Sequence, residues 1–209
     1  MKSLVVAGIG TGVGKTLVAA ILTEVLQADY WKPVQAGNLN FTDTDTVRSL
    51  ITNTRSVIHS EVYSLQAAIS PHAAAELDNV EIELLKLSIP ANKTRLIIEL
   101  AGGIMVPLNK KQLNIDLLVK WNLPVILVSQ NYLGSINHTL LSVEALKSRG
   151  IQLAGIIFNG ESRSPTEEFI LEYTAVRCLA RINPEKEINK HVVKQYADIL
   201  KEQLNNSLL

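Results

Sequence analysis

The stretch Gly8-Ile9-Gly10-Thr11-Gly12-Val13-Gly14-Lys15-Thr16 decides which fold this sequence predicts. It follows the apolar run 4–7 and leads into the periodic apolar segment 17–26, so a buried strand, a glycine-rich loop and an amphipathic helix are predicted in succession. Glycines let successive backbone N–H groups point to one place, and the helix presents its positive N-terminal end there. The stretch therefore predicts a binding site for a multiply charged phosphate group.

Two side chains at the end of this loop carry the expected chemistry. Lys15 would reach the outer phosphates, and the Thr16 hydroxyl would be a ligand of a bridging Mg²⁺. The loop departs from the usual spacing, because Ile9 occupies the first glycine position and Gly8 comes one residue early. A glycine-rich turn with a solvated lysine is the structural alternative.

Composition favours one soluble α/β domain over residues 1–209. The chain is 47% hydrophobic, enough for a sizeable core, and its 20 basic and 20 acidic residues give no overall field for nucleic acid or an acidic membrane. Cys178 is the only cysteine, which excludes an intramolecular disulfide and a multi-cysteine metal site. With no apolar run of membrane-spanning length, the expected location is the cytoplasm.

Lys32 lies in the segment 30–37, which is predicted to be a strand that is short, or at an edge, or finished by Pro33. Ligands gather at the carboxyl ends of parallel strands, so Lys32 would face the same crevice as the phosphate loop. An exposed structural lysine is the alternative.

Carboxylates occur in two later segments. Asp43 and Asp45 either cap the helix that runs through 50–51 or supply one Mg²⁺ ligand, and their chemistry does not choose between them. Glu99 interrupts the apolar strand predicted at 96–101, which two glycines follow, and an unpaired buried carboxylate would cost several kcal/mol. We expect Glu99 to hold the metal or position water, with a plain salt bridge as the alternative.

The rest of the chain alternates strands and helices, which predicts parallel pairing and a three-layer phosphate-loop fold with helices on both faces of a mainly parallel sheet. Strand 123–129 leads through 131–138 into a helix that Ser135 or Asn137 would cap, and whose N-terminus could bind an anion. Asn159 ends strand 153–159, where it would contact a purine or form an Asn-Gly turn. Helices are also expected at 71–77, near 80–88 and through 192–200.

Taken together, several of these motifs resemble the dethiobiotin synthetase family as far as about residue 160. The resemblance rests on the segments 8–16, 30–37, 70–72, 99–103, 133–138 and 153–155. It implies an ATP- and Mg²⁺-dependent cyclo-ligase of biotin synthesis, in which a carbamate formed from 7,8-diaminononanoate and CO₂ attacks the γ-phosphate and a second amine closes the ureido ring.

The resemblance also implies roles for individual residues. Lys15, Lys32 and Thr11 would stabilise the transferring group, and Thr16, Asp45 and Glu99 would hold Mg²⁺, which resolves the choice of aspartate toward Asp45. The implied nucleotide site consists of Gly12, Val13, Gly14, Lys15, Thr16, Leu17, Asp45, Glu99, Gly102 and Asn159, with 183–185 in a later nucleotide loop. Lys32 and the amides of Gly134, Ser135, Ile136 and Asn137 would bind substrate, the last four across a homodimer interface.

Departures from the family pattern leave two rival interpretations. Gly10 and Gly12 stand where many members have polar or acidic residues, and Ala36 stands where a serine is common near the carbamate. One is a dimeric partitioning or metal-delivery ATPase that acts as a switch. Such a protein would carry a lysine at the position of Gly10, so the glycine argues against this interpretation. A non-catalytic nucleotide-binding module is opposed by Lys15, Thr16, Asp45 and Glu99 occurring together.

Overall fold

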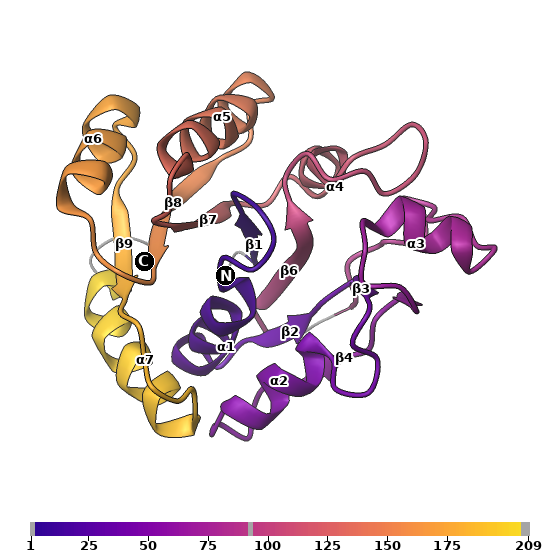
Figure 1. The fold of residues 1–209 in the computed structure, drawn as a ribbon. Helices are drawn as coiled ribbons and strands as arrows, with labels where there is room; N and C mark the ends of the chain where they lie inside the picture. The colour runs from indigo at the N-terminus through magenta and orange to yellow at the C-terminus, as the bar shows by residue number, and fades with distance from the viewer. Residues whose placement is uncertain (1–2, 92–93, 206–209) are drawn as a thin grey trace.

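A central parallel sheet lies between two layers of helices in the computed structural model, which describes residues 3–91 and 94–205 (Figure 1). Its seven strands run in the order β4-β2-β6-β1-β7-β8-β9, and all of their described pairs are parallel. The strands are β1 (Leu4–Gly8), β2 (Asp29–Trp31), β4 (Ile58–His59), β6 (Leu96–Gly103), β7 (Val125–Gln130), β8 (Leu153–Asn159) and β9 (Cys178–Ile182). The predicted strand alternation and parallel pairing are confirmed.

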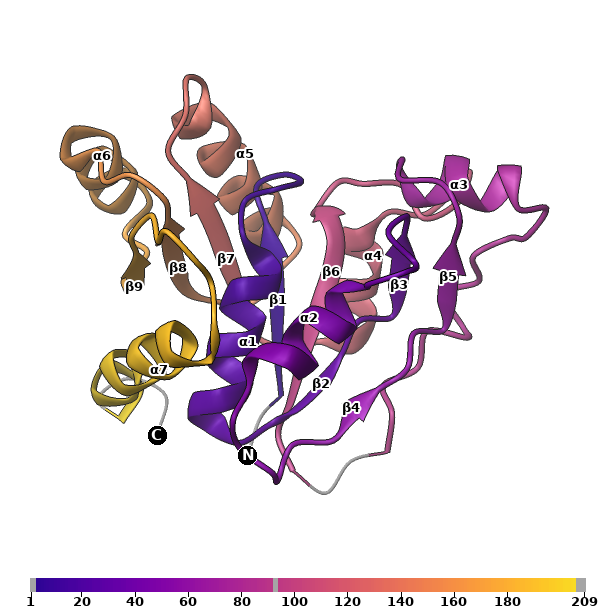
Figure 2. The same ribbon diagram turned by 60° about the horizontal axis from the view of Figure 1, so that its bottom comes forward.

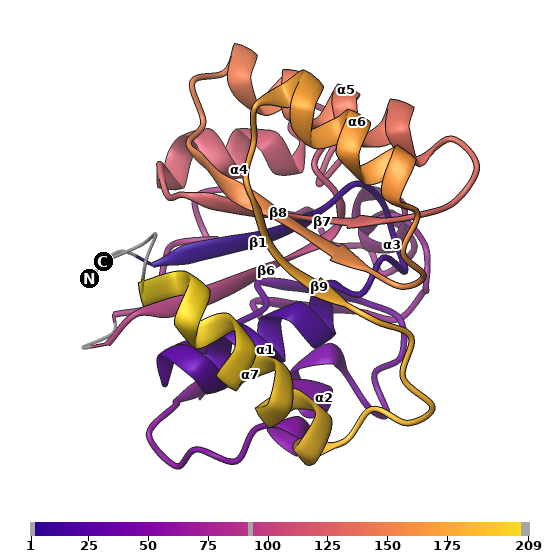
Figure 3. The same cartoon turned by 90° about the vertical axis from the view of Figure 1, so that its left-hand side faces the viewer.

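The helices divide between the two faces of the sheet, as Figure 3 shows. One layer contains α1 (Lys15–Leu26), α2 (Asp43–Leu50) and α7 (Lys190–Asn205). The other contains α4 (Asn114–Trp121), α5 (Ser135–Ser148) and α6 (Ser164–Thr174). This is the predicted three-layer arrangement.

A small second sheet lies beside the main one. It pairs β3 (Val34–Ala36) with β5 (Tyr63–Leu65) in parallel, and α3 (Pro71–Leu77) lies next to it (Figure 2). The predicted strand 30–37 is thus divided at Pro33, which lies between β2 and β3. A proline cannot donate to a sheet ladder, so the chain leaves the main sheet there.

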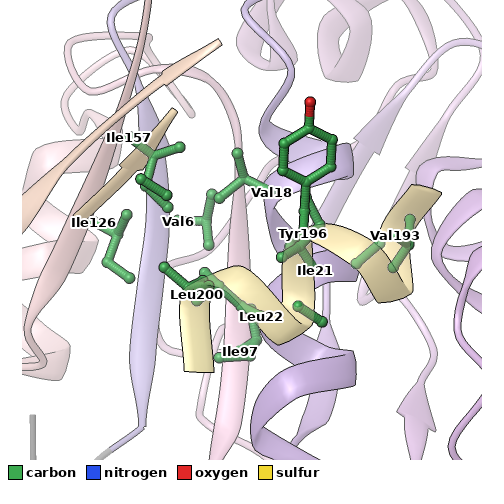
Figure 4. Close-up of a cluster of buried hydrophobic side chains, with 14 of the residues drawn as sticks. Val6, Val18, Ile21, Leu22, Ile97, Ile126, Ile157, Val193, Tyr196 and Leu200 are labelled. Atoms are coloured by element: carbon green, nitrogen blue, oxygen red, sulfur yellow. The ribbon is translucent and has the colours of Figure 1, made fainter. Parts of the chain in front are cut away.

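The largest core cluster lies between the sheet and the α1 and α7 helices (Figure 4). Val18, Ile21 and Leu22 of α1 meet Val193 and Leu200 of α7, and the spacing of these apolar residues follows the helical repeat. All five residues of β1 are buried, because both faces of the strand are covered. A strand that is buried on both faces is apolar throughout. This packing fixes the start of α1 against the end of β1.

The helix predicted near 80–88 is wrong, because this segment forms turns and irregular chain. Its apolar side chains Ile82 and Leu87 are fully buried, and its carbonyl groups accept hydrogen bonds from outside the segment. Asn109 Nδ2 donates to Ile82 O at 2.8 Å, and Trp121 Nε1 donates to Leu87 O at 3.0 Å. Tertiary partners therefore satisfy the backbone without a helix.

No helix within 3–91 and 94–205 is both long enough and apolar enough to cross a membrane.

Candidate active site

The phosphate loop joins β1 to α1 in the predicted strand-loop-helix order. Gly12 and Gly14 have φ values of 76° and 92°, a conformation that favours glycine. A Cβ on Gly8 would lie 2.8 Å from Val13 Cγ2 and 2.9 Å from Gly10 O. Close packing therefore explains a glycine at this early position, although the usual spacing does not require one there.

Lys15 begins α1 and folds back over the loop. Its side chain is buried, and Nζ donates to Gly10 O at 2.8 Å. Burial lowers the Lys15 pKa from 10.5 to about 8, the nearby Lys32 lowers it further, and the Glu99 and Asp43 carboxylates oppose the shift. An anion placed against this lysine would stabilise its charged form.

Glu99 is the centre of a buried hydrogen-bond network. Its side chain is 1% exposed, and Oε1 accepts from Thr16 Oγ1 at 2.9 Å and from Lys32 Nζ at 3.0 Å. Oε2 accepts from the Tyr30 hydroxyl at 2.8 Å. These partners compensate the buried carboxylate, so Thr16, Lys32 and Glu99 are brought together as predicted.

Lys32 follows the last residue of β2 and is also buried. Its Nζ forms ion pairs with Glu99 and Asp43. Burial by itself would lower the Lys32 pKa, but the two carboxylates outweigh it and the pKa is raised. Lys32 is therefore a permanently charged group within the network, and the alternative of an exposed lysine is excluded.

Asp43 and Asp45 occupy different environments. Asp43 contacts Lys32 in the site. Asp45 is at the third position of α2, where Oδ2 accepts from the backbone and side chain of Thr42 and Oδ1 accepts from Arg48. This capping box turns the Asp45 carboxylate to the helix terminus, so its role as a metal ligand stays a prediction.

A cavity of about 590 Å³ lies over these residues. Eight of the residues predicted for the site line it, namely Thr11, Gly12, Gly14, Lys15, Thr16, Lys32, Glu99 and Gly102. Residues from the small-sheet side line it as well, among them Gln35, Ala36, Ala68 and Ser70. The cavity thus joins the charged groups of the phosphate loop to a mixed polar and apolar lining.

Val13, Leu17 and Asn159 lie around the loop without lining this cavity. Val13 and Leu17 pack with the core cluster. The Asn159 side chain donates from Nδ2 to Val13 O at 3.1 Å. Asn159 therefore contacts the phosphate loop from the end of β8, and its contact with a base stays a prediction.

The 134–137 segment begins α5 and lies apart from the phosphate cavity. Gly134 caps this helix with φ 99° and no side-chain hydrogen bond, so the predicted cap by Ser135 or Asn137 is wrong. A second cavity of about 350 Å³ lies between the start of α5 and the phosphate loop, lined by His138, Leu141 and Ser142 on one side and by 9–11 on the other. Thr11 lines both cavities, so the two are neighbours.

Sequence reasoning missed two contributors to the network. The sequence predicts Tyr30 only as part of a strand, and the resemblance favours Asp45 over Asp43. A signal for Tyr30 exists, because it precedes Lys32 by two residues and residues two apart share one face of a strand. The pairing of Asp43 with Lys32 has no such signal, since the 37–42 loop between them has no regular repeat.

Comparison with solved structures supports the fold. The septum site-determining protein MinD of Pyrococcus horikoshii, complexed with Mg-ADP, aligns with a TM-score of 0.56 at 16% identity and covers 99% of each chain. A plasmid partition protein of Borrelia burgdorferi gives a TM-score of 0.57 at 15% identity, covering 98% of this chain and 99% of that one. Identities this low show a shared phosphate-loop ATPase fold and nothing about activity.

Sequence comparison is far more specific. The AAA domain family profile matches residues 2–192. An ATP-dependent dethiobiotin synthetase of Cytophaga hutchinsonii is 50% identical over 94% of this chain and 96% of its own length. That of Christiangramia forsetii is 49% identical over 97% of this chain and 98% of its own. With these identities along nearly the whole length, and with the phosphate loop, Lys32 and Glu99 meeting in one cavity, the chain belongs to the ATP-dependent dethiobiotin synthetase family.

Proposed function

We propose that this protein is an ATP-dependent cyclo-ligase that converts 7,8-diaminononanoate, CO₂ and ATP into dethiobiotin, ADP and phosphate. The observation that carries the proposal is the joining of Lys15, Lys32 and the Thr16–Glu99 pair in one cavity, in a chain of this family. Two buried lysines place ammonium groups in the cavity, where they can stabilise a transferring phosphoryl group.

The chain supplies an arrangement of donors around the phosphates. The loop amides and Lys15 bind the β- and γ-phosphates, and Thr11 donates to the transferring group. Lys32, which is fixed by its ion pairs, would contact the carbamate and the γ-phosphate. Its charge stabilises the negative charge that moves between them.

The residues present fit a bound Mg²⁺. Thr16 Oγ1 and Glu99 Oε1 lie 2.9 Å apart, and both are oxygen ligands of the kind that Mg²⁺ prefers. Mg²⁺ takes most of its remaining ligands from phosphate and water. When bound, Mg²⁺ would neutralise charge on the phosphate oxygens.

The chemical steps balance as follows. One substrate amine adds to CO₂ and loses a proton, giving a carbamate. A carbamate oxygen attacks the γ-phosphorus, ADP departs, and a carbamic-phosphoric anhydride is left. The second amine attacks the carbamoyl carbon, phosphate departs, and loss of a proton leaves the ureido ring. Substrate that fills the cavity would displace water from around the anhydride.

The α5 start supports a homodimer as part of this proposal. The amides of 134–137 would bind the substrate carboxylate of a neighbouring subunit, because they lie at the N-terminus of α5 and the adjoining Leu133 is 98% exposed. Sedimentation measurements test the dimer. A cytoplasmic location, where ATP and bicarbonate are both present, completes the proposal.

The deciding experiment measures phosphate release from Mg-ATP and bicarbonate with and without 7,8-diaminononanoate, while mass spectrometry follows dethiobiotin. We expect phosphate release that requires the diamine and equals the dethiobiotin formed. Lys15→Gln should abolish both, and Lys86→Gln, which changes an exposed lysine that forms an ion pair with Glu83, is the matched control that keeps them.

Two other outcomes would reject the proposal. Hydrolysis of ATP that is indifferent to the diamine would favour a nucleotide switch like the partitioning ATPases that share the fold. Intact ATP binding without any turnover would favour a non-catalytic module.

A further inference from the structure

The Tyr30 hydroxyl is a polar group in the interior whose partner is a residue of the phosphate site. Tyr30 is 0% exposed, and its hydroxyl donates to Glu99 Oε2 at 2.8 Å. A buried hydroxyl is retained at a cost unless it is hydrogen-bonded, so this contact is what allows a tyrosine here. None of the predicted roles includes Tyr30.

Sheet register explains why the two groups meet. In the parallel pairing of β2 with β6, Tyr30 lies opposite Ile97, and Glu99 is two residues further along β6 on the same face. Lys32 is two residues beyond Tyr30 and approaches Glu99 as well. The chain through β2 therefore supplies two donors to one carboxylate.

The donors divide between the two carboxylate oxygens. Oε1 faces Thr16 and Lys32, and Oε2 accepts from Tyr30. No other hydrogen bond to Oε2 is found in the part of the chain that the structure describes. A carboxylate held at both oxygens cannot rotate its Oε1 away from Thr16 without breaking the bond to Tyr30.

We propose that Tyr30 is a positioning residue, which anchors Oε2 of Glu99 so that Oε1 is presented to Thr16 and to the Mg²⁺ of the bound nucleotide. The inference rests on the proposed function only in taking a Mg²⁺-nucleotide as the ligand. Hydrogen bonds to the outer atoms of metal-ligating side chains orient those ligands, and their loss commonly weakens metal affinity about 10- to 100-fold.

Tyr30→Phe is a sharp test, because it removes one oxygen and keeps the ring that fills the core. Tyr63→Phe is the matched control: the Tyr63 hydroxyl accepts from the Glu83 backbone at 3.0 Å and does not line the phosphate cavity. Mn²⁺ serves as the probe for the metal, since electron paramagnetic resonance measures the free ion in titrations of the ADP-bound protein. ADP affinity in excess chelator and the urea midpoint are measured for each variant.

We expect Tyr30→Phe to weaken Mn²⁺ binding about tenfold while ADP affinity without metal stays within about twofold. Tyr63→Phe should leave Mn²⁺ binding unchanged. In a Glu99→Gln background, removing the Tyr30 hydroxyl should have little further effect on Mn²⁺ affinity, because the metal-ligating carboxylate is already absent.

A folded Tyr30→Phe protein with normal Mn²⁺ affinity would overturn the inference, and so would an equal loss in the Glu99→Gln background. A lower urea midpoint alone would assign the hydroxyl to stability. The test needs no diamine, so an enzyme that binds Mn²⁺-ADP through Glu99 but forms no dethiobiotin would defeat the proposed function and leave this inference intact.

Discussion

We expect Lys15 to make the ligand-free protein more stable as the pH rises. An ordinary salt-bridged lysine has the opposite effect, because its pKa is raised by folding. Burial lowers the Lys15 pKa to about 8 in the folded protein, against 10.5 for a solvated lysine. At neutral pH the folded state must therefore hold a buried ammonium group. Each pKa unit is worth about 1.4 kcal/mol, so this charge costs the fold on the order of 3 kcal/mol.

The cost is relieved as pH rises. Between the two pKa values the unfolded chain keeps the proton that the folded chain has lost, so the free energy of unfolding increases with pH. From about pH 7 to about pH 9.5 the expected gain is about 2 kcal/mol. Nucleotide reverses the preference, because its phosphates stabilise the ammonium form, and ADP binding near pH 9 should take up a proton.

Urea unfolding of wild type and Lys15→Met at both pH values isolates this effect. Other titrating groups are common to the two proteins, so the change of the difference with pH reports the ammonium group of Lys15, including its bond to Gly10 O. We compare the free energy of unfolding of the wild type with that of the variant. The wild-type value minus the variant value should be about 2 kcal/mol larger at the higher pH. A difference that stays constant, or falls, would refute the buried-charge reasoning.

Four further substitutions test separate parts of the site. Lys32→Gln should lower kcat on the order of a hundredfold with a smaller change in KM for ATP, whereas equal kcat values would remove Lys32 from the chemistry. Gly14→Ala places a Cβ 2.2 Å from Asn159 Nδ2 at φ 92°, so its urea midpoint should fall, while Gly10→Ala meets no atom within 4 Å and serves as the control. Asp43→Asn should lower kcat by loosening Lys32, and Asp45→Asn should lower the urea midpoint by weakening the α2 capping box. A higher half-saturating Mg²⁺ concentration in Asp45→Asn alone would instead assign that carboxylate to the metal.

Local sequence was sufficient for the elements whose signals are contained within a few residues. The phosphate loop could be predicted because glycine spacing, the preceding apolar run and the following helical repeat all favour one strand-loop-helix unit. Glu99 was a strong candidate for the site, because one carboxylate in an apolar strand needs a partner. The alternation of strands and helices likewise indicated the parallel, three-layer fold.

Tertiary structure decided whatever depended on partners distant in the chain. The segment near 80–88 is not helical, and Asn109 and Trp121 donate to two of its carbonyl groups, Ile82 O and Leu87 O. No local pattern indicates such donors. Loop geometry brings Asp43 to Lys32 and leaves Asp45 in a helix cap. Local propensity and periodicity act over a few residues and can be recognised in the sequence. The partner of a buried charge depends on register and packing across the whole sheet.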